Sequence, residues 1–473
     1  MSFDTVSSAA GAPALRAAML GLALLLGACA DTPSQRRTPI DAGTGFKEAG
    51  LWQNAAISAD AVPDAWWTLF RDPVLDQLQS EVSVGNANLQ VSLAQFRAAQ
   101  AAIDAARAPL FPSVGASLGV NRSANALASP RGTTYTAQAG LSNWEIDLWG
   151  RLSGSVDVAR ARADASRDDL AAATLSVRAT LSQTYFQLRA AEAQIALLQD
   201  SVTAYQRSLQ LTRNRFDAGV AASADVAQAQ SQLKSTEAQL LDARSSRAQY
   251  EHAIAILLGK PPSALALPVT GRLPEPPQVP LQLPSRLLER RPDIAAAERR
   301  VAAAYAQIGV ARAAFFPALT LSANGGFRGT ELGTLLSAAN KFWSIGPALA
   351  LSLFDGGARQ AGVASARAEA EQAEAAYRQV VLAALQEVED NLVLGANLGE
   401  QSRMQSEALE AARKNLDVVT NQYQAGTVSY LNVVTAQTAA LSSERAVLDA
   451  RSRRLTALNQ LLKNIAGRWE SPS

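Results

Sequence analysis

The 473-residue sequence contains one cysteine, Cys29, and one histidine, His252. A single cysteine excludes an internal disulfide framework and any zinc site that is built from several cysteines. A single histidine rules out the usual histidine metal clusters, and His252 lies in a helical segment, where a place on a helix face explains it better than catalysis. We therefore expect no catalytic residue, no metal site, no enzymatic activity and no cofactor other than a covalent lipid.

Net charge and aromatic residues are also scarce. The net charge is +1, which gives no electrostatic reason to expect a nucleic-acid partner. Aromatic residues make up 6% of the chain, although 48% of it is hydrophobic, and much of that share is alanine. This composition favours long, closely packed helices over a thick globular core.

Long hydrophobic runs are absent except for a short one near the N-terminus. Arg16 precedes the apolar run 17–26, which is too short for a permanent membrane helix and is typical of a signal-peptide core. The run ends in the sequence LGAC, which resembles the bacterial lipobox, so residues 1–28 are predicted to be a lipoprotein signal peptide. Cys29 would then carry the lipid. An incidental cysteine beside an ordinary signal peptide is the alternative.

Prolines are unevenly distributed, and their distribution separates two similar halves. Residues 88–112 match 293–317 at a constant offset, which indicates a tandem duplication. The proline-rich segment between the halves cannot continue a helix. The predicted organisation is a signal peptide at 1–28, a lipid-anchored extension at 29–65, a first repeat at 66–259, a linker at 260–291, a second repeat at 292–467 and a tail at 468–473.

After the Phe-Pro pair of each half, the hydrophobic period changes from helical to two. Alternating apolar and polar residues predict one β-hairpin per half, at about 113–148 and 318–354. The alternation changes phase after Leu141, which we interpret as the point where a strand leaves lipid. Pro347 predicts an edge or an end in the fourth strand.

Proline-free helical stretches follow each hairpin, at 152–216 and 358–423, and each could extend for roughly 95 Å. Heptad spacing of their apolar residues predicts coiled-coil packing. Each stretch meets a glycine, Gly219 or Gly426, and then a returning helix, so the sequence predicts long helical hairpins at about 151–259 and 358–466. We expect the glycines to cap the helix ends and Ser223 to cap the first returning helix.

Four amphipathic strands are too few for a membrane barrel, since about eight are the minimum. The barrel must therefore be shared between chains. Two chains would give eight strands and a filled lumen, whereas three would give twelve strands and an open pore. The small, polar inner faces favour three.

The duplication, the twin hairpin tips and three segments resemble the TolC-like outer-membrane factors, in particular the lipoprotein branch that serves tripartite efflux pumps. The segments are LLERRPDIAAAERRVAAA, FFPALTLSANGG and IGPALALSLFDGG. The resemblance implies a mixed α and β fold, in which a homotrimer forms a twelve-stranded outer-membrane β-barrel and a twelve-helix periplasmic α-barrel. It also implies a lipid-anchored protein of the bacterial outer membrane that extends into the periplasm. The implied partners are a periplasmic adaptor and an inner-membrane pump of the RND type.

The same resemblance assigns roles to individual residues. The family signature comprises Arg290, Arg291, Pro292 and Asp293, for which we expect a structural role at the start of a helix. The tips expected to contact the adaptor contain Arg215, Gly219, Val220, Gly426 and Thr427. The periplasmic aperture is expected at Tyr423, Tyr430, Leu431 and Thr435, and Thr435 stands where well-known relatives have an aspartate.

The predicted function is a passive exit duct for small toxic compounds, driven by a separate pump. Two other cargoes remain open for the same fold, secreted polypeptide and metal ions. The lipobox argues against the first, and three methionines give no thioether ladder for the second. A lipid-anchored coiled-coil scaffold is the other alternative, although it leaves the four strands unexplained.

Overall fold

The computed structural model describes residues 46–47, 64–125, 129–277 and 291–465. The predicted signal peptide, Cys29, Arg290 and the tail therefore lie outside the described residues. The chain divides into two compact units. The strand unit includes Ile103–Arg160 and Val301–Gln372, and the helical unit includes Ile40–Ala102, Ala161–Arg300 and Ala373–Ser473.

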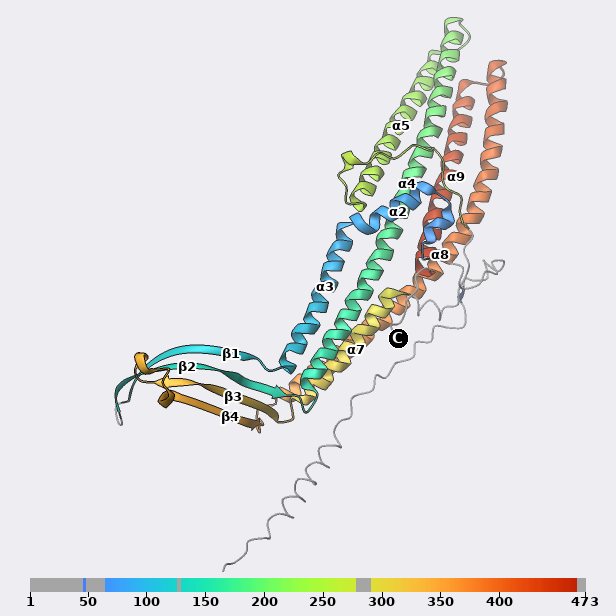
Figure 1. Ribbon diagram of the computed structural model, residues 1–473. Helices are drawn as coiled ribbons and strands as arrows, with labels where there is room; N and C mark the ends of the chain where they lie inside the picture. The colour runs from blue at the N-terminus through green and yellow to red at the C-terminus, as the bar shows by residue number, and fades with distance from the viewer. Residues whose placement is uncertain (1–45, 48–63, 126–128, 278–290, 466–473) are drawn as a thin grey trace, which may run out of the picture. The chain divides into compact units, whose positions relative to one another are not determined.

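The strand unit contains an antiparallel sheet with the strand order β1-β2-β3-β4 (Figure 1). Its strands are β1 (Val114–Asn125), β2 (Ser129–Ile146), β3 (Ala318–Gly329) and β4 (Lys341–Ala350). The four predicted strands are therefore present, two from each repeat. Pro347 lies in β4, an edge strand, which confirms the expectation drawn from its missing N–H.

The register of the sheet places apolar residues on one face and polar or small residues on the other. One level of the apolar face aligns Val114, Leu141, Ala323 and Ile345. The next residues along the strands align on the opposite face as Gly115, Gly140, Asn324 and Ser344. Because side chains alternate along a strand, this register makes the whole sheet amphipathic.

The change of phase after Leu141 has a different cause from the one we expected. Leu141 pairs with Ala323 and Trp144 pairs with Leu321, so two residues of β2 oppose one residue of β3. Asn143 adopts a φ of 49° within this irregularity. The bulge keeps Trp144 on the same apolar face as Leu141. The phase change is therefore explained without an exit from lipid, and the place where the strand leaves lipid stays a prediction.

On the polar face, the backbones of β2 and β3 leave no room for a side chain at two glycines. A Cβ atom at Gly326 would lie 2.1 Å from the carbonyl oxygen of Ala137, and one at Gly140 would lie 2.4 Å from that of Ala323. Only glycine fits such a close approach of backbones. Crowding on this side is what a sheet that curves toward its polar face would produce.

Aspartates fix the junctions between strands and long helices in both repeats. Asp147 accepts hydrogen bonds from the N–H groups of Leu152 and Ser153 at 3.1 and 2.8 Å. Asp355 accepts from the N–H groups of Gly357 and Arg359. Burial raises the pKa of Asp147, but its hydrogen bonds from Ser153 and Leu152 outweigh burial and leave that pKa below its ordinary value. Each carboxylate satisfies amides that the first helical turn leaves unpaired.

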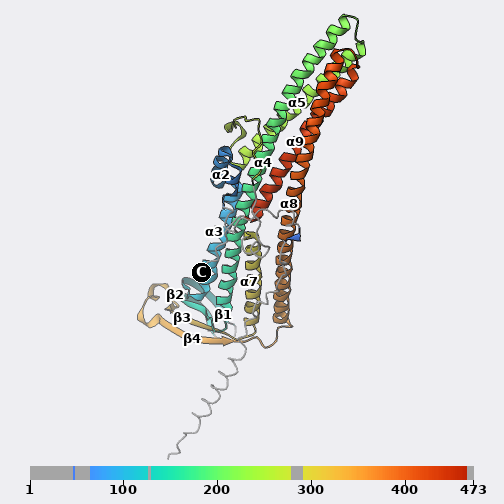
Figure 2. The same cartoon turned by 90° about the vertical axis from the view of Figure 1, so that its right-hand side faces the viewer.

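Two helical hairpins dominate the helical unit, and Figures 1 and 2 show α5 alongside α4 and α9 alongside α8. Their bounds are α4 (Arg151–Asp217), α5 (Ser223–Leu257), α8 (Ala358–Gln424) and α9 (Tyr430–Ile465). Shorter helices precede the strands of each repeat, α2 (Pro73–Gly85) with α3 (Ala87–Arg107) in the first and α7 (Pro292–Ala313) in the second. Among the described residues, no helix is both long enough and apolar enough to cross a membrane.

The main core of the helical unit joins the N-terminal helices to both hairpins. Trp66 is completely buried, and its indole N–H donates to Asn459 Oδ1 at 3.1 Å. Asn459 Nδ2 in turn donates to the carbonyl oxygen of Ala179 on α4. Leucines of α4, α8 and α9 surround this contact. The first and second repeats therefore share one hydrophobic core.

Candidate functional site

The first part of the candidate site is the pair of hairpin tips. Gly219 and Gly426 have φ values of 75° and 78°, in the left-handed region that glycine adopts without a Cβ penalty. Beyond Gly219, the N–H of Val220 donates to the carbonyl oxygen of Arg215 at 2.8 Å. Beyond Gly426, the N–H of Thr427 donates to the carbonyl oxygen of Gln422 at 3.0 Å. Both tips thus end a long helix with the same glycine-based C-cap.

The cap of the first returning helix differs from the one predicted. Ser223 is the first residue of α5, and the N-cap position is Ala222. Asp225 reaches back instead, and its Oδ2 accepts from the N–H of Ala222 at 3.3 Å. An acidic group in the first turn also suits the positive end of the helix. The prediction of Ser223 as the N-cap was wrong by one residue.

Arg215 connects the two tips. Its Nη1 donates to the carbonyl oxygens of Tyr423 and Gln424 at 3.0 and 3.2 Å, and its guanidinium lies 4.8 Å from the ring centre of Tyr423. The last carbonyls of a helix have no partner within that helix and carry partial negative charge. A cation from the first hairpin therefore stabilises the end of α8 in the second.

Two tyrosines complete this inter-tip cluster, which we define as Ser208, Thr212, Arg215, Tyr423 and Tyr430. The tyrosine rings meet edge to face with their centres 5.4 Å apart. The hydroxyl of Tyr430 lies 3.0 Å from that of Ser208, and the Tyr423 hydroxyl donates to Thr212 at 3.4 Å. Burial raises the pKa of Tyr430, so this phenol stays neutral. The four hydroxyl side chains of the cluster form an uncharged, hydrogen-bonded contact, and the guanidinium of Arg215 closes it from one side.

The structure places the predicted tip and aperture residues in two different environments. Tyr423 and Tyr430 are buried against the first hairpin, with 4% and 1% of their surface exposed. Val220, Thr427, Leu431 and Thr435 are exposed, as are both tip glycines. Arg215, predicted to contact an adaptor, is half-buried with Nη1 engaged by the second tip. The adaptor and aperture roles themselves stay predictions.

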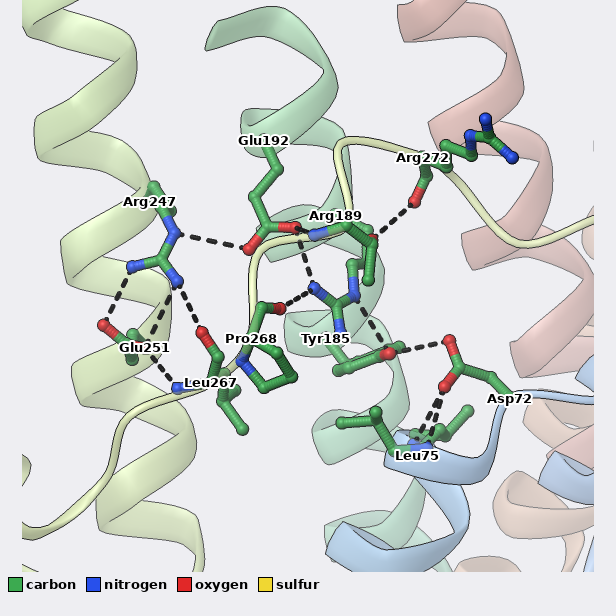
Figure 3. A network of polar contacts seen from close by, with 12 residues as sticks. Asp72, Leu75, Tyr185, Arg189, Glu192, Arg247, Glu251, Leu267, Pro268 and Arg272 are labelled. Atoms are coloured by element: carbon green, nitrogen blue, oxygen red, sulfur yellow. Dashed lines mark hydrogen bonds and ion pairs between the residues drawn. The ribbon is translucent and has the colours of Figure 1, made fainter. Parts of the chain in front are cut away.

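A second polar site lies further along α4 and α5, and its side chains bind the chain segment that follows α5. We call residues 260–277 the strap. Arg189 and Glu192 of α4 and Arg247 of α5 converge beneath it (Figure 3). Glu192 is fully buried and accepts from Arg189 Nη1 at 2.7 Å and from Arg247 Nε at 3.3 Å.

Backbone groups of the strap complete this network. Arg189 Nη1 donates to the carbonyl oxygen of Pro268 at 2.7 Å, and the N–H of Thr270 donates to Glu192 at 3.1 Å. Arg247 Nη2 donates to the carbonyl oxygen of Leu267 at 3.0 Å. Buried charges are tolerated only when they are paired and hydrogen-bonded. Arg189 and Glu192 are paired, and within the described residues Arg189 Nη2 is the nitrogen of this network that is buried without a hydrogen-bond partner. The strap therefore cannot detach without leaving buried charges poorly satisfied.

The network continues to the N-terminal helices through a tyrosine. Arg189 Nε donates to the hydroxyl of Tyr185 at 2.9 Å, and that hydroxyl donates to Asp72 Oδ2 at 2.6 Å. Burial and the neighbouring Asp72 raise the pKa of Tyr185. Asp72 also caps α2 by accepting from the N–H groups of Val74 and Leu75. One chain of contacts thus links α2, α4, α5 and the strap.

The signature residues lie at the start of α7 and connect it to two other helices. Arg291 is 8% exposed, and its Nη1 donates to Glu387 of α8 at 3.0 Å and to Asn464 of α9 at 3.1 Å. Burial raises the pKa of Asp293, but the hydrogen bonds and charge of Arg291 outweigh it, so this pKa lies below its ordinary value. Pro292 is the first residue of the helix. These contacts support a structural role for the motif.

Our sequence reading missed the Arg189–Glu192 pair and the role of Ser208. The interruption of a leucine heptad by Arg247 was the one visible signal of the buried network. No sequence feature indicated the strap residues that take part in this network, because Leu267 and Pro268 contribute only backbone carbonyl oxygens to it. In the described part of the chain, no group of three or more metal-ligating side chains is close enough to hold an ion.

The family model described as "Outer membrane efflux protein" matches residues 78–260 and 283–467. The chain belongs to this outer membrane efflux protein family. Its two matched segments correspond to the two repeats, and the resemblance to TolC-like channels is confirmed.

Individual relatives cover nearly the whole chain. The probable efflux pump outer membrane protein TtgC of Pseudomonas putida is 30% identical over 94% of both chains. The probable outer membrane lipoprotein SilC of Salmonella typhimurium is 28% identical over 94% of this chain and 97% of its own. The solved structure of the outer-membrane channel OprN has 31% identity and a TM-score of 0.84, and it covers 91% of this chain and 98% of its own.

Family membership settles several expectations. The protein is an outer-membrane efflux channel of bacteria, and its fold combines long helices with a small β-domain as expected. As in the rest of the family, it is an outer-membrane component of an efflux pump, which implies partners in the periplasm and the inner membrane.

Proposed function

We propose that three copies of this chain form a duct through which a separate pump, of the RND type, expels small toxic compounds. The observation that carries the proposal is the four-stranded sheet with one apolar face, one polar face and two open edges. Such a sheet cannot close on itself, and its unpaired edge strands require neighbours in a membrane. Three copies supply twelve strands and a polar lumen wide enough for small molecules.

The crowded glycines of the sheet support a polar lumen. Crowding at Gly140 and Gly326 occurs on the polar face, which would be the inside of the barrel. The apolar face would then meet lipid. Large apolar side chains such as Leu118 and Ile345 are exposed there, at 87% and 65%. A structural coiled-coil scaffold would leave this exposed apolar sheet unexplained.

The hairpin tips are the natural place for an adaptor. They carry exposed apolar or small residues on turns whose shape is fixed by glycine caps and by Arg215. The relative TtgC is named as a probable outer-membrane protein of an efflux pump, which supports a pump partner for this chain. The name of SilC describes an outer-membrane lipoprotein, which supports lipid attachment at Cys29. The energy for export then comes from the pump, and the duct needs no catalytic residue.

Adjacent residues on opposite faces of β1 provide a matched test. Leu118 lies on the apolar face and Ser117 on the polar face. Leu118→Lys should reduce the trimer recovered from outer membranes, because a lysine facing lipid at the bilayer midplane costs about 2–4 kcal/mol. Ser117→Lys should leave the trimer intact and shift the ion selectivity of the pore toward anions. Light scattering in detergent and conductance in planar bilayers measure the two outcomes.

The same experiment can refute the proposal. A wild-type protein that is monomeric in detergent and does not conduct would overturn the duct. Equal effects of the two lysines on trimer yield would show that the two faces do not separate lipid from lumen.

A further inference from the structure

The polar face of the sheet carries a charged side chain, Arg328, near the turn between β3 and β4. Arg328 pairs with Thr136 of β2 and lies four residues after Asn324, which the register places on the polar face. Thr136 likewise lies four residues before Gly140 on that face. Because side chains alternate along a strand, the register directs the guanidinium of Arg328 to the polar side of the sheet.

Arg328 lies at the end of the sheet that is away from the connections to the helices. Strands β1 and β3 begin after α3 and α7, and strands β2 and β4 lead into α4 and α8. The two hairpin turns therefore share the opposite end of the sheet, where Arg328 is the second-last residue of β3. In a duct whose helices extend into the periplasm, this end is the outer one.

An aromatic ring positions the charge. Arg328 Cζ lies 5.1 Å from the ring centre of Phe342, a distance at which a cation is attracted to an aromatic face. Phe342 is half-buried and lies on the same face, because it pairs with Gly326, two residues before Arg328. Arg328 is exposed, and in the described part of the chain its guanidinium has no carboxylate partner. Its N–H donors therefore remain available to a solute.

Other charged side chains of the sheet do not offset this one. On the polar face, Glu145 lies at the helix end of β2 and accepts from Arg151 Nε at 2.9 Å, so its charge is neutralised. Near the turns, the register places Arg122 and Lys341 on the apolar face. Glu331 is exposed in the β3–β4 turn and, among the described residues, forms no ion pair. The polar face thus has one uncompensated cation at its outer end.

Resting on the proposed function, we infer that Arg328 binds oxyanions near the outer end of the duct and makes this end selective for anions. The ligands would be the carboxylate, sulfonate or phosphate groups of solutes. Three copies place three guanidinium groups around one lumen, and a ring of arginines attracts anions and disfavours cations. The guanidinium fork matches the geometry of an oxyanion, and the hydroxyl of Thr136 beside it is a further donor.

Conductance of the full-length protein in planar bilayers tests the inference. A potassium chloride gradient gives the charge selectivity, and inositol hexakisphosphate serves as a multivalent anionic blocker. The wild type should be blocked at lower concentration from the side of the strand turns than from the side of the helices. Arg328→Gln should shift the selectivity toward cations and raise the half-blocking concentration at least about tenfold, because charged hydrogen bonds are lost in every copy. Arg328→Lys, which keeps the charge, should retain the anion selectivity.

Arg122→Gln is the matched control, because it removes a cation from the apolar face near the same turns. It should conduct and be blocked as the wild type is, and both glutamine variants should yield normal amounts of trimer. Equal shifts in the two glutamine variants, or a shift in neither, would overturn this inference alone. A wild type that does not conduct overturns the proposed function as well.

Discussion

At the scale of single residues, Arg215 contributes most to the candidate site. The sequence predicted its position at a tip but not its contacts, because its acceptors are backbone carbonyls of a helix 208 residues away. A backbone carbonyl oxygen that is free to accept a hydrogen bond at a helix end cannot be recognised from residue types in the sequence. The tyrosines beside it were expected at an aperture, and the structure buries both against the first hairpin of the same chain.

Replacement of Arg215 by alanine should loosen the second tip. The variant loses the two hydrogen bonds to Tyr423 and Gln424 and the stacking on the Tyr423 ring. Hydrogen bonds to a charged group contribute about 1.5–3 kcal/mol each, so we expect local opening to become at least about tenfold more frequent. Hydrogen exchange of the Gly426 and Thr427 amides measures this opening.

Arg213→Ala is the control for this experiment. Arg213 lies two residues away and is exposed. In this control variant, the amides of Gly426 and Thr427 should exchange at the wild-type rate. Unchanged protection at Gly426 in the Arg215 variant would refute the link between the tips.

At the scale of whole elements, the two repeats have corresponding helices, but these helices make different contacts. Arg247 of α5 binds Glu192 and the strap, whereas its counterpart Arg454 of α9 packs against Gly399. A Cβ atom at Gly399 would lie 3.3 Å from Arg454 Cζ. Within the described residues, Arg454 Nε is buried without a hydrogen-bond partner. The duplication thus predicts the positions of the helices. Individual residue differences between the repeats determine which contacts those helices make.

Glu192→Gln should release the strap and destabilise the helical unit. Its carboxylate is fully buried between Arg189 and Arg247, and removal of one partner of a buried ion pair costs about 3–5 kcal/mol. We expect a clearly lower melting temperature and faster proteolysis within residues 260–277. Glu237→Gln, which removes an exposed pair with Lys234, should change neither. A strap that stays resistant to protease in the Glu192 variant would contradict the role of the network.

Bulky residues at the tip glycines should abolish efflux without affecting assembly. Gly219→Val and Gly426→Val force a branched side chain into the left-handed region, which costs about 1–2 kcal/mol and displaces the turn. Antibiotic resistance of cells that carry the matching pump should be lost, while trimers are recovered in normal yield. Asparagine, which tolerates this conformation, should retain more resistance at both positions. Loss of the trimer would show instead that the tips are only folding turns.

At the scale of the whole molecule, the lipid predicted on Cys29 and the amphipathic sheet would be separate means of membrane attachment. Cys29 lies outside the described residues, so its lipidation rests on the sequence and on the likeness to a lipoprotein. Cys29→Ala, made with a signal peptide that is cleaved without lipid, should lose incorporation of labelled palmitate. The protein should still fractionate with outer membranes and form conducting trimers, because the apolar face of the sheet remains. A water-soluble, non-conducting monomer would refute the channel.

The sequence alone determined the duplication, the four amphipathic strands, the two long hairpins and the family. The first three depend on periodicity, on proline and on glycine, which act on the local backbone, whereas the family was indicated by the resemblance of three sequence segments. Only the tertiary structure decided that a bulge keeps Trp144 on the apolar face, that Arg215 closes the two tips together and that a buried ionic network holds the strap. Each of these depends on which groups meet across more than fifty residues of chain. A local sequence pattern does not show such contacts, because several of the partners are backbone atoms that every residue possesses.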